Sequence, residues 1–271
     1  MCKALSVSKS AYYNYKSKQQ REEEHRELER LVLGVFRFHK RRYGTRRIVD
    51  ELGDLDIKVG RRKVSSILSK YGLQAIQPKS FVPKTTQSPS GMLRSPNLLL
   101  DRPFPQDINM VWVGDITYLP MASKCWSYLA SWLDLCSRHI VAWEVSDHMR
   151  EDIVIDSFKK GVLKRRPGSN LIVHSDGGGQ YGSKSFRRLL ANTKSQQSMT
   201  RRDNHYDNAY AESLFSRLKA ELIGTGRFSS LEDARKECFD YIEGYYNTIR
   251  KHSSLGYKSP LQFERELKRS K

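Results

Sequence analysis

Cysteine is scarce in this sequence of 271 residues, and its four cysteines form no Cys-x-x-Cys pair. They are Cys2, Cys125, Cys136 and Cys238. This scatter predicts reduced, structural thiols and gives no spacing for a zinc module. Long apolar runs are missing as well: no stretch approaches the roughly 18 residues of a membrane span, and the first residues lack the apolar core of a signal peptide. These absences predict a cytoplasmic protein with no membrane partner.

Negative charge is in the minority, because 30 Asp and Glu residues face 48 Lys and Arg residues, for a formal net charge of +18. A surplus of this size indicates a polyanionic partner, since contacts between cationic side chains and phosphates release counterions and favour binding. A basic protein without a nucleic-acid partner is the plainer alternative. An anionic membrane is a weaker one, because no basic amphipathic segment with a clean apolar face is present.

Two acidic residues lie on apolar, β-branched segments that are typical of buried strands. Leu171–Ser175 leads into Asp176, which is followed by Gly177–Gly179, and a crevice normally opens at such a strand end in an α/β sheet. Val111–Tyr118 is another predicted strand, and it carries Asp115 among apolar residues. The sequence therefore predicts two carboxylates on strands of an α/β sheet.

A third carboxylate lies on a helix predicted over residues 208–222. At 100° per residue the apolar side chains share one arc, and Glu212 and Lys219 lie together on its margin. The arc consists of Ala211, Leu214, Phe215, Leu218 and Leu222. A carboxylate at the rim of a buried helix face can point into a crevice rather than into bulk water.

Taken singly, each acid has an ordinary explanation, because Asp at a strand end commonly forms a turn or a cap. As a set they are less ordinary, since like charges repel and their burial is stable only with protons or cations. Oxygen ligands suit Mg²⁺ or Mn²⁺, and two such ions can clamp the attacking and leaving oxygens of a phosphodiester displacement. Asp115, Asp176 and Glu212 are therefore the predicted catalytic residues and metal ligands, with two ions expected.

The motifs around these acids resemble those of the DDE transposases of the insertion-sequence-three group, whose core is similar to that of retroviral integrases. The resemblance covers nearly the whole chain and matches the downstream reading-frame product of these elements. The matching segments are Trp112–Tyr118, Leu133–Trp143, His174–Tyr181, Asp207–Phe215 with Lys219, and Tyr246–Asn247 through His252–Gly256 to Ser259–Pro260.

This resemblance implies a ribonuclease H-like fold and an Mg²⁺-dependent polynucleotidyl transferase that cleaves and transfers DNA strands in transposition, recombination and integration. It implies DNA partners, namely the terminal repeats of the element and the target DNA, and a homo-oligomer on that DNA. An upstream-frame protein, separate or fused by frameshifting, is a further expected partner. The expected location is the bacterial cytoplasm, with the nucleoid when DNA is bound.

Three more residues near the acids are expected to take part. Lys219 is expected to contact DNA phosphate near the metals, the alternative being a solvated helix lysine. His174 and Asn208 are expected to support the carboxylates, although His174 could equally be a hydrogen-bonded core residue.

A basic helical module is predicted over residues 22–75. The expected helices are an apolar repeat from Leu28 to Phe36 behind the acidic first turn Glu22–Glu24, a segment from the N-cap Thr45 to Gly53, and a segment from Arg61 to Gly72. Cations at the start of the third helix favour a helix-turn-helix DNA-binding domain over a bundle with a basic solvated face. The expected DNA contacts are Arg41, Arg42, Tyr43, Arg46, Arg47, Arg61, Arg62 and Lys63.

The other segments complete the predicted domain order. Residues 1–21 form a truncated helical segment, and residues 76–106 form a Pro/Ser/Lys-rich linker of which little can be buried. Residues 107–223 form the integrase-like catalytic core, and residues 224–271 form its C-terminal helical extension, with Ser230 as a helix N-cap.

Within the core the patterns predict a mixed α/β sheet. The expected elements are an antiparallel meander of strands over 111–118, 125–134 and 138–146, a helix near 150–163, a strand over 171–175, a helix over 183–191 and a short strand near 195–199. Strands followed by alternating helix and strand describe a mixed sheet flanked by helices, preceded here by the small all-α domain.

Several alternatives stay open or are set aside. Gly177, Gly179 and Gly182 match a dinucleotide fingerprint with Asp203 downstream, but Asp176 immediately before them would repel a pyrophosphate. Asp134 also lies in an apolar strand, and a hairpin role is favoured over a ligand role. The alternative functions are a DNA-binding regulator with an inactive core, and a metal-dependent nuclease without strand transfer, which would use the same carboxylates.

Overall fold

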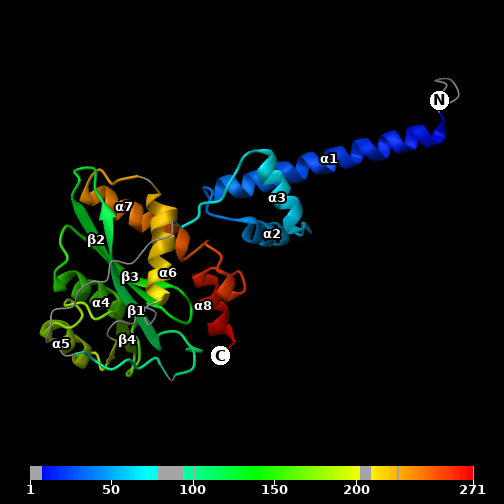
Figure 1. Ribbon diagram of the computed structural model, residues 1–271. Helices are drawn as coiled ribbons and strands as arrows, with labels where there is room; N and C mark the ends of the chain where they lie inside the picture. The colour runs from blue at the N-terminus through cyan, green and yellow to red at the C-terminus, as the bar shows by residue number, and fades with distance from the viewer. Residues whose placement is uncertain (1–7, 79–93, 101, 202–208, 225, 271) are drawn as a thin grey trace. The chain divides into compact units, whose positions relative to one another are not determined.

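The computed structural model describes residues 8–78, 94–100, 102–201, 209–224 and 226–270. The chain consists of two compact units, Met1–Gln77 and Pro78–Lys271 (Figure 1). The first unit is all-helical, and the second contains a five-stranded mixed sheet flanked by helices. The predicted fold class, an α/β core preceded by a small all-α domain, is confirmed.

The first unit contains three helices, α1 (Lys9–Phe38), α2 (Thr45–Gly53) and α3 (Arg61–Lys70). Their apolar faces meet in a small core of buried side chains: Val32, Phe36, Tyr43, Ile48, Leu52, Val64 and Ile67. The predicted stop after α3 is confirmed, because Gly72 has a φ of +62°, the left-handed conformation that glycine tolerates best.

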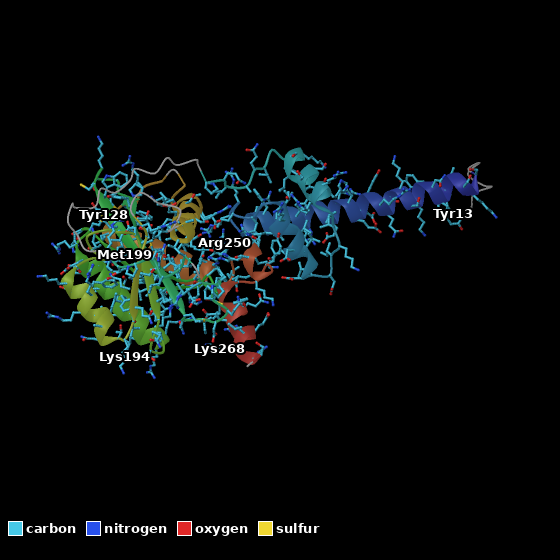
Figure 2. All side chains as sticks on the ribbon, turned by 60° about the horizontal axis from the view of Figure 1, so that its bottom comes forward. Tyr13, Tyr128, Lys194, Met199, Arg250 and Lys268 are labelled. Carbon is cyan, nitrogen blue, oxygen red and sulfur yellow. The ribbon has the colours of Figure 1, made fainter. Side chains whose placement is uncertain are left out.

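The first helix begins earlier than the sequence predicts. Ser8 caps α1, since its Oγ accepts a hydrogen bond from the Ala11 amide at 3.1 Å. The prediction that Glu22–Glu24 form an acidic first turn is therefore wrong, and the helix runs straight through residue 21. The N-terminal half of α1 is exposed on all sides, as Tyr13 illustrates (Figure 2). Nothing in residues 9–33 breaks the helix, because this stretch contains neither glycine nor proline.

The start of α2 also differs from the prediction. Thr45 is the first residue of the helix, and Gly44 occupies the N-cap position without a side-chain hydrogen bond. By contrast, the prediction for Ser230 is confirmed, because its side chain accepts a hydrogen bond from the Asp233 amide at 3.0 Å.

The sheet of the second unit has the strand order β3-β2-β1-β4-β5. Its strands are β1 (Val111–Pro120), β2 (Trp126–Asp134), β3 (Ile140–Ser146), β4 (Ile172–Ser175) and β5 (Gln196–Met199). The first three form an antiparallel meander, while β4 pairs in parallel with both β1 and β5. This is the mixed sheet that the sequence predicts, with each strand beginning within two residues of its expected position.

Helices cover both faces of this sheet (Figure 1). They are α4 (Glu151–Arg165), α5 (Lys184–Asn192), α6 (Ala209–Leu218), α7 (Leu231–Tyr241) and α8 (Pro260–Arg269), with π-helical turns η2 (Lys219–Ile223) and η3 (Ile242–Tyr246) and a 3₁₀ turn η4 (Ser253–Leu255). On one face, Trp112 and Trp132 pack against α4 and α5 in a large core. On the other, Val111 and Val113 pack against Ala211 of α6. The alternation along β1 thus sends its odd-numbered residues toward α6.

Part of the predicted linker is incorporated into the second unit. Ser95 Oγ hydrogen-bonds Gln197 at 2.8 Å, and the Leu98 amide donates to Ser198 Oγ at 2.9 Å. Leu98 and Leu99 pack against the apolar cluster under α6. Ser95, Leu98 and Leu99 are thus half-buried, which is more than the expectation for residues 76–106 allows, because β5 is an edge strand with polar groups and apolar side chains left to cover.

No helix among the described residues is long and apolar enough to cross a membrane. Cys125, Cys136 and Cys238 are free thiols, as their spacing predicts.

Candidate active site

The register of two parallel strands brings two of the predicted acids together. Gly114 of β1 pairs with Ser175, the last residue of β4, and each is followed by an aspartate, Asp115 and Asp176. Neighbouring strands lie roughly 4.8 Å apart, so the two half-buried carboxylates are adjacent at the carboxyl end of β4. This is the end of a parallel ladder at which an α/β sheet opens.

Gly114 is required beside Asp115 because the Trp132 ring occupies the space of a side chain. A Cβ on Gly114 would lie 2.3 Å from the nearest ring atom of Trp132. The ring is held in place, since its Nε1 donates to Ser157 Oγ at 3.0 Å and it stacks on Phe186. The glycine therefore lets the strand pass close to a rigid core and brings Asp115 to the edge of that core.

The third predicted acid comes from α6. Ala211, Leu214, Phe215 and Leu218 form its buried face, and Glu212 is exposed beside it. The predicted arc is thus confirmed except for Leu222, which is half-buried, because the α-helix ends at Leu218 and the π-helical turn that follows buries Glu221 instead. Lys219 is the first residue of η2, the π-helical turn that continues α6, and its side chain is half-buried. Because α6 packs on the face of β1 toward which Asp115 points, one helix carries both Glu212 and Lys219 near that aspartate.

Electrostatic coupling links these four groups. Burial raises the pKa of Asp115 well above its usual range, and the negative charges of Asp176 and Glu212 raise it further. The Ile116 amide, 2.7 Å from Asp115 Oδ1, and the Lys219 ammonium lower the pKa of Asp115 in part. Burial lowers the pKa of Lys219, and Asp115 acts against that shift. The three acids and the lysine therefore share one electrostatic site.

Asp176 is balanced by different neighbours. Burial raises its pKa, while a hydrogen bond from the Gly178 amide at 2.9 Å and the positive charge of Arg94 lower it. Arg94 lies against the backbone of Gly177, where a Cβ would meet the guanidinium carbon at 2.4 Å. Its Nη1 also donates to the Thr200 carbonyl at 3.4 Å.

Two residues of this site were missed in the sequence. Arg94 lies in a stretch that reads as linker, and no motif distinguishes it from other cations there. Tyr181 is buried near the two aspartates, and burial together with the charges of Asp115 and Asp176 raises its pKa well above the usual range. Tyr181 ends a matching segment and could have been found there.

The chemistry of the donors fits a hard divalent cation, because carboxylate oxygens are its preferred ligands and a cation would relieve the mutual repulsion of Asp115 and Asp176. Across the described ranges, however, no three His, Cys, Asp or Glu side chains gather closely enough to form a metal-binding group. Asp115 and Asp176 are thus adjacent, whereas Glu212 is an exposed carboxylate whose negative charge raises the pKa of Asp115.

Other predicted residues fall in different surroundings. His174 is fully buried, and its Nδ1 hydrogen-bonds Ser198 Oγ at 2.8 Å, which ties β4 to β5. This environment matches the alternative that His174 is a hydrogen-bonded core residue. Asn208 lies outside the described residues, as does Asp203 of the dinucleotide pattern.

Asp134 has the hairpin role that the sequence favours. It is fully buried, and its carboxylate accepts hydrogen bonds from the amides of Asn109 (2.6 Å), Cys136 (3.0 Å) and Ser137 (3.0 Å). With its oxygens bound by three backbone donors, Asp134 organises the turn between β2 and β3.

The predicted DNA contacts of the first unit are mostly exposed. Arg41, Arg46, Arg61, Arg62 and Lys63 are exposed, and Arg42 and Arg47 are half-buried. Tyr43 differs from the expectation that it contacts DNA, because it is fully buried and stacks on His39 with ring centroids 3.5 Å apart. A core aromatic of this kind has no surface to offer to DNA.

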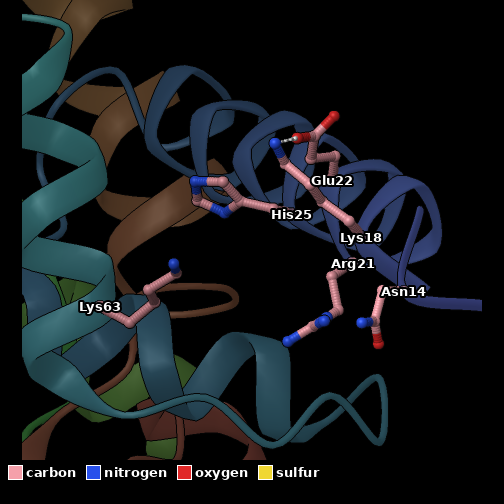
Figure 3. Close-up of a pocket in the computed structure, with 6 residues that line it drawn as sticks. All are labelled: Asn14, Lys18, Arg21, Glu22, His25 and Lys63. Atoms are coloured by element: carbon pink, nitrogen blue, oxygen red, sulfur yellow. Dashed lines mark ion pairs between the residues drawn. The ribbon is translucent and has the colours of Figure 1, made fainter. Parts of the chain in front are cut away.

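Lys63 also faces an open cavity of about 630 Å³ between α3 and the exposed half of α1 (Figure 3). The cavity is lined by Asn14, Lys18, Arg21, Glu22, His25 and Lys63. Lys18 and Glu22 form an ion pair at 4.0 Å, and Arg21 and Lys63 add two further cations to the lining of the cavity. The cavity widens the cationic surface of this unit beyond the residues that the sequence predicts.

Comparison with known proteins finds family models that match parts of both units. An HTH-like domain model matches residues 22–81, and two models described as integrase core domains match residues 106–205 and 193–260. The transposase for insertion sequence element IS904 of Lactococcus lactis is 39% identical over 92% of this chain and 97% of the relative. The transposase InsF for insertion sequence IS3A of Escherichia coli is 35% identical over 97% of this chain and 92% of the relative.

Among solved structures, a chain of the simian T-cell lymphotropic virus intasome with PP2A regulatory subunit B56 gamma has a TM-score of 0.48 at 14% identity, covering 86% of this chain and 74% of that chain. The HTLV-2 integrase catalytic core in complex with magnesium has a TM-score of 0.43 at 16% identity, covering 58% of this chain and 96% of that chain.

Proposed function

The chain belongs to the insertion-sequence-three group of transposases, enzymes that cut and join DNA, and we propose that it does so with Asp115, Asp176 and Glu212 as metal-binding catalytic residues. The observation that carries this proposal is the β1–β4 register, which puts two aspartates side by side at the carboxyl end of β4, within electrostatic reach of Glu212.

The proposed cofactor is Mg²⁺ or Mn²⁺, as two ions. When bound, such ions activate the attacking water or 3′-hydroxyl and stabilise the leaving oxygen of the phosphodiester. Asp115 and Asp176 would hold cations at the sheet, and Glu212 would complete the ligand set from α6. Lys219 would bind a DNA phosphate beside them, since a half-buried ammonium next to Asp115 is suited to a second anion. None of the residues proposed for this site is an activated nucleophile, so the proposed reaction includes no covalent link between protein and DNA.

The helical unit would position the DNA. In this proposal residues 22–75 bind the element ends, with Arg61, Arg62 and Lys63 at the start of α3 and the cations of the neighbouring cavity on its flank. Residues 107–223 carry out strand cleavage and transfer, and residues 224–271 extend that core. Pairing two DNA ends calls for at least two copies, and an upstream-frame partner or fusion is also proposed. The reaction would take place in the bacterial cytoplasm, where the DNA is.

The decisive experiment measures strand transfer of a labelled, pre-cleaved terminal-repeat DNA with Mg²⁺ or Mn²⁺. It compares the chain with Glu212→Gln and with the control Glu237→Gln, which removes an equivalent exposed carboxylate from α7. Joined products should disappear in Glu212→Gln and persist in the control.

Joining that survives in Glu212→Gln would remove Glu212 from the active site. Cleavage without joining in the unchanged chain would favour the nuclease. DNA binding without either activity would favour the regulator, or a catalytic protein that lacks its upstream partner, and repeating the assay with the fused upstream frame separates these two.

A further inference from the structure

The helix that carries Glu212 ends in an unusual turn. After Leu218, α6 continues as the π-helical turn η2, in which the Gly224 amide donates to the Lys219 carbonyl at 3.0 Å. A π-helical turn is rare, because its wider ring is less favourable than an α-helical one, and such turns occur frequently at functional sites. Something outside the helix must therefore stabilise the turn that begins at Lys219.

A buried ion pair lies at this turn. Glu221 of η2 accepts two hydrogen bonds from Arg250, at 2.8 Å from Nε and 2.6 Å from Nη2. Both side chains are only 3% exposed. The Tyr241 hydroxyl donates a third hydrogen bond to Glu221 at 3.0 Å. The fork of the guanidinium fits the carboxylate in one geometry, so the pair fixes the orientation of Glu221 and with it the register of η2.

Arg250 is itself tied to the sheet through its own segment. Its Nη1 lies 3.3 Å from His252 Nε2, and its guanidinium lies 5.7 Å from the centre of the Tyr246 ring. Three residues before Arg250, the Asn247 side chain accepts a hydrogen bond from the Ile140 amide at 2.9 Å and donates to the Ile140 carbonyl at 3.1 Å. A continuous set of contacts therefore runs from β3 through residues 247–252 to the end of α6.

We propose that Arg250 is a positioning residue, which acts through Glu221 to hold the π-helical turn and thereby places Lys219 and Glu212 opposite Asp115. This gives a role to the C-terminal Tyr-Asn…His-Ser-Ser-Leu-Gly segment, which the catalytic proposal leaves unused. The inference rests on the proposed function in so far as Glu212 and Lys219 are taken as active-site residues.

Specific positioning explains the pair better than stability alone. Desolvating two charges offsets much of their attraction, so a buried ion pair contributes little stability compared with apolar side chains of the same size. What it supplies is a single allowed geometry. Misplacement of a catalytic group by about 1 Å can cost about 100-fold in rate, so a fixed geometry at Lys219 has a large effect on catalysis.

The second unit contains another buried arginine–glutamate pair that can serve as a control for Arg250. Arg165 and Glu264 form a second buried pair, with Nη1 and Nη2 at 2.7 Å and 2.6 Å from the carboxylate and side chains 11% and 4% exposed. This pair joins α4 to α8, and Arg165 also hydrogen-bonds Asn109, so its partners belong to neither α6 nor η2. Both arginines make two hydrogen bonds to one largely buried carboxylate, Arg250 through Nε and Nη2 and Arg165 through Nη1 and Nη2, and they differ in which elements they hold.

The test compares Arg250→Lys with Arg165→Lys in the full chain, because lysine keeps the charge and loses the fork. Amide hydrogen exchange of residues 209–223 should accelerate about tenfold in Arg250→Lys and stay unchanged in Arg165→Lys, since only the first releases η2. At saturating terminal-repeat DNA, the joining rate should fall about 100-fold in Arg250→Lys, with the DNA concentration for half-saturation changed little.

Equal exchange of residues 209–223 in the two variants, or unchanged exchange in Arg250→Lys, would overturn the proposal. If Arg250→Lys does not fold, Tyr241→Phe removes a single bond to Glu221 and should accelerate exchange in the same segment more weakly. The exchange measurement does not depend on catalysis. Joining that survives Glu212→Gln would therefore refute the catalytic proposal and leave the positioning of η2 to be judged by exchange alone.

Discussion

Three arginines of the second unit differ in environment from the exposed arginines of the first, although other arginines of the second unit, such as Arg150 and Arg217, are exposed as well. In the first, helical unit (Met1–Gln77), Arg41, Arg46, Arg61 and Arg62 are exposed, whereas Arg138, Arg165 and Arg250 of the second unit (Pro78–Lys271), here called the catalytic unit, are buried or half-buried. The exposed group can reach phosphate, while the buried group binds the protein's own carboxylates and aromatic rings. The net charge of +18 counts both alike, so it overstates the cationic surface that DNA can meet.

The buried and half-buried carboxylates of the catalytic unit differ in their neighbours. Asp134, Glu221 and Glu264 are surrounded by donors, whereas Asp115 and Asp176 are adjacent to each other. A buried carboxylate bound by donors has its charge compensated, whereas one placed beside another carboxylate has a charge that costs stability, as is common at functional sites. The neighbours of a buried acid, rather than its burial, distinguish the candidate site from the scaffold.

The largest effect is expected from testing this difference directly. Asp176→Asn should reduce strand joining about a thousandfold or more, because the proposed metal site loses a ligand. It should also stabilise the protein by about 1 kcal/mol at neutral pH, since the substitution removes a charge that burial disfavours. Burial raises the pKa of Asp134 as well, but Asp134→Asn should lower stability, because an amide oxygen cannot accept from all three backbone donors and one of them would be left unsatisfied. Joining assays and urea unfolding of both variants make the comparison, and a loss of stability in Asp176→Asn would contradict it.

A second effect is a pH dependence of stability that we expect in the catalytic unit, where His139 lies. Burial lowers the pKa of His139 to about 4, against the attraction of Glu264, while Arg165 lowers it further. The unfolded chain binds this proton at a pH near 6.5 and the folded chain only near 4, so stability is lost as pH falls between these values, by at most about 3 kcal/mol. All four tryptophans, Trp112, Trp126, Trp132 and Trp143, belong to the catalytic unit, so their fluorescence follows its unfolding alone.

His139→Gln should flatten this pH dependence between pH 6.5 and pH 4 and leave stability at pH 8 within about 1 kcal/mol of the unchanged chain. Unfolding curves in urea at a series of pH values supply the measurement. An identical slope in both proteins would show that His139 is not the group responsible.

A third effect concerns glycines: some glycines of the catalytic unit, such as Gly114, are tightly enclosed, whereas a Cβ on the glycines described in the helical unit would meet no atom within 4 Å. Gly114→Ala should destabilise the catalytic unit by about 2 kcal/mol, because the new methyl group would overlap the Trp132 ring. Gly34→Ala in α1 meets no atom within 4 Å, and should stabilise that helix by up to about 1 kcal/mol. Thermal unfolding, followed by tryptophan fluorescence for Gly114→Ala and by circular dichroism for Gly34→Ala, tests both signs. A neutral result for Gly114→Ala would mean that Trp132 can move.

The same contrast explains what the sequence could predict. The strands of the catalytic unit are short apolar runs bounded by turns, so their positions follow from local pattern, and the apolar arc of α6 places Glu212 at its margin. The start of α1 was missed because residues 9–27 carry no apolar stripe, and only the cap at Ser8 and the lack of helix breakers indicated it.

What could not be predicted depends on partners distant in sequence. The π-helical turn at Lys219 rests on Arg250, and the position of Arg94 rests on the edge of β5 and on Gly177. The burial of Tyr43 against His39 likewise separates it from the arginines beside it, although all of them lie in one basic stretch. In each case the residue type was visible, and its neighbour was not.

The smallest effect tests whether exposed cations of the helical unit bind DNA because of their place or only because of their charge. Replacing Arg61, Arg62 and Lys63 by alanine should weaken binding of terminal-repeat DNA about tenfold and reduce the salt slope by roughly 2, since up to three phosphate contacts are lost. The control replaces Lys159, Lys160 and Lys164 of α4 by alanine. Their side chains are 59%, 61% and 51% exposed, and this substitution removes the same charge from the catalytic unit. Fluorescence anisotropy at several salt concentrations measures both. If the two triple variants lose equal affinity and equal slope, net charge alone accounts for the binding; a larger loss at the start of α3 locates the DNA on the helical unit.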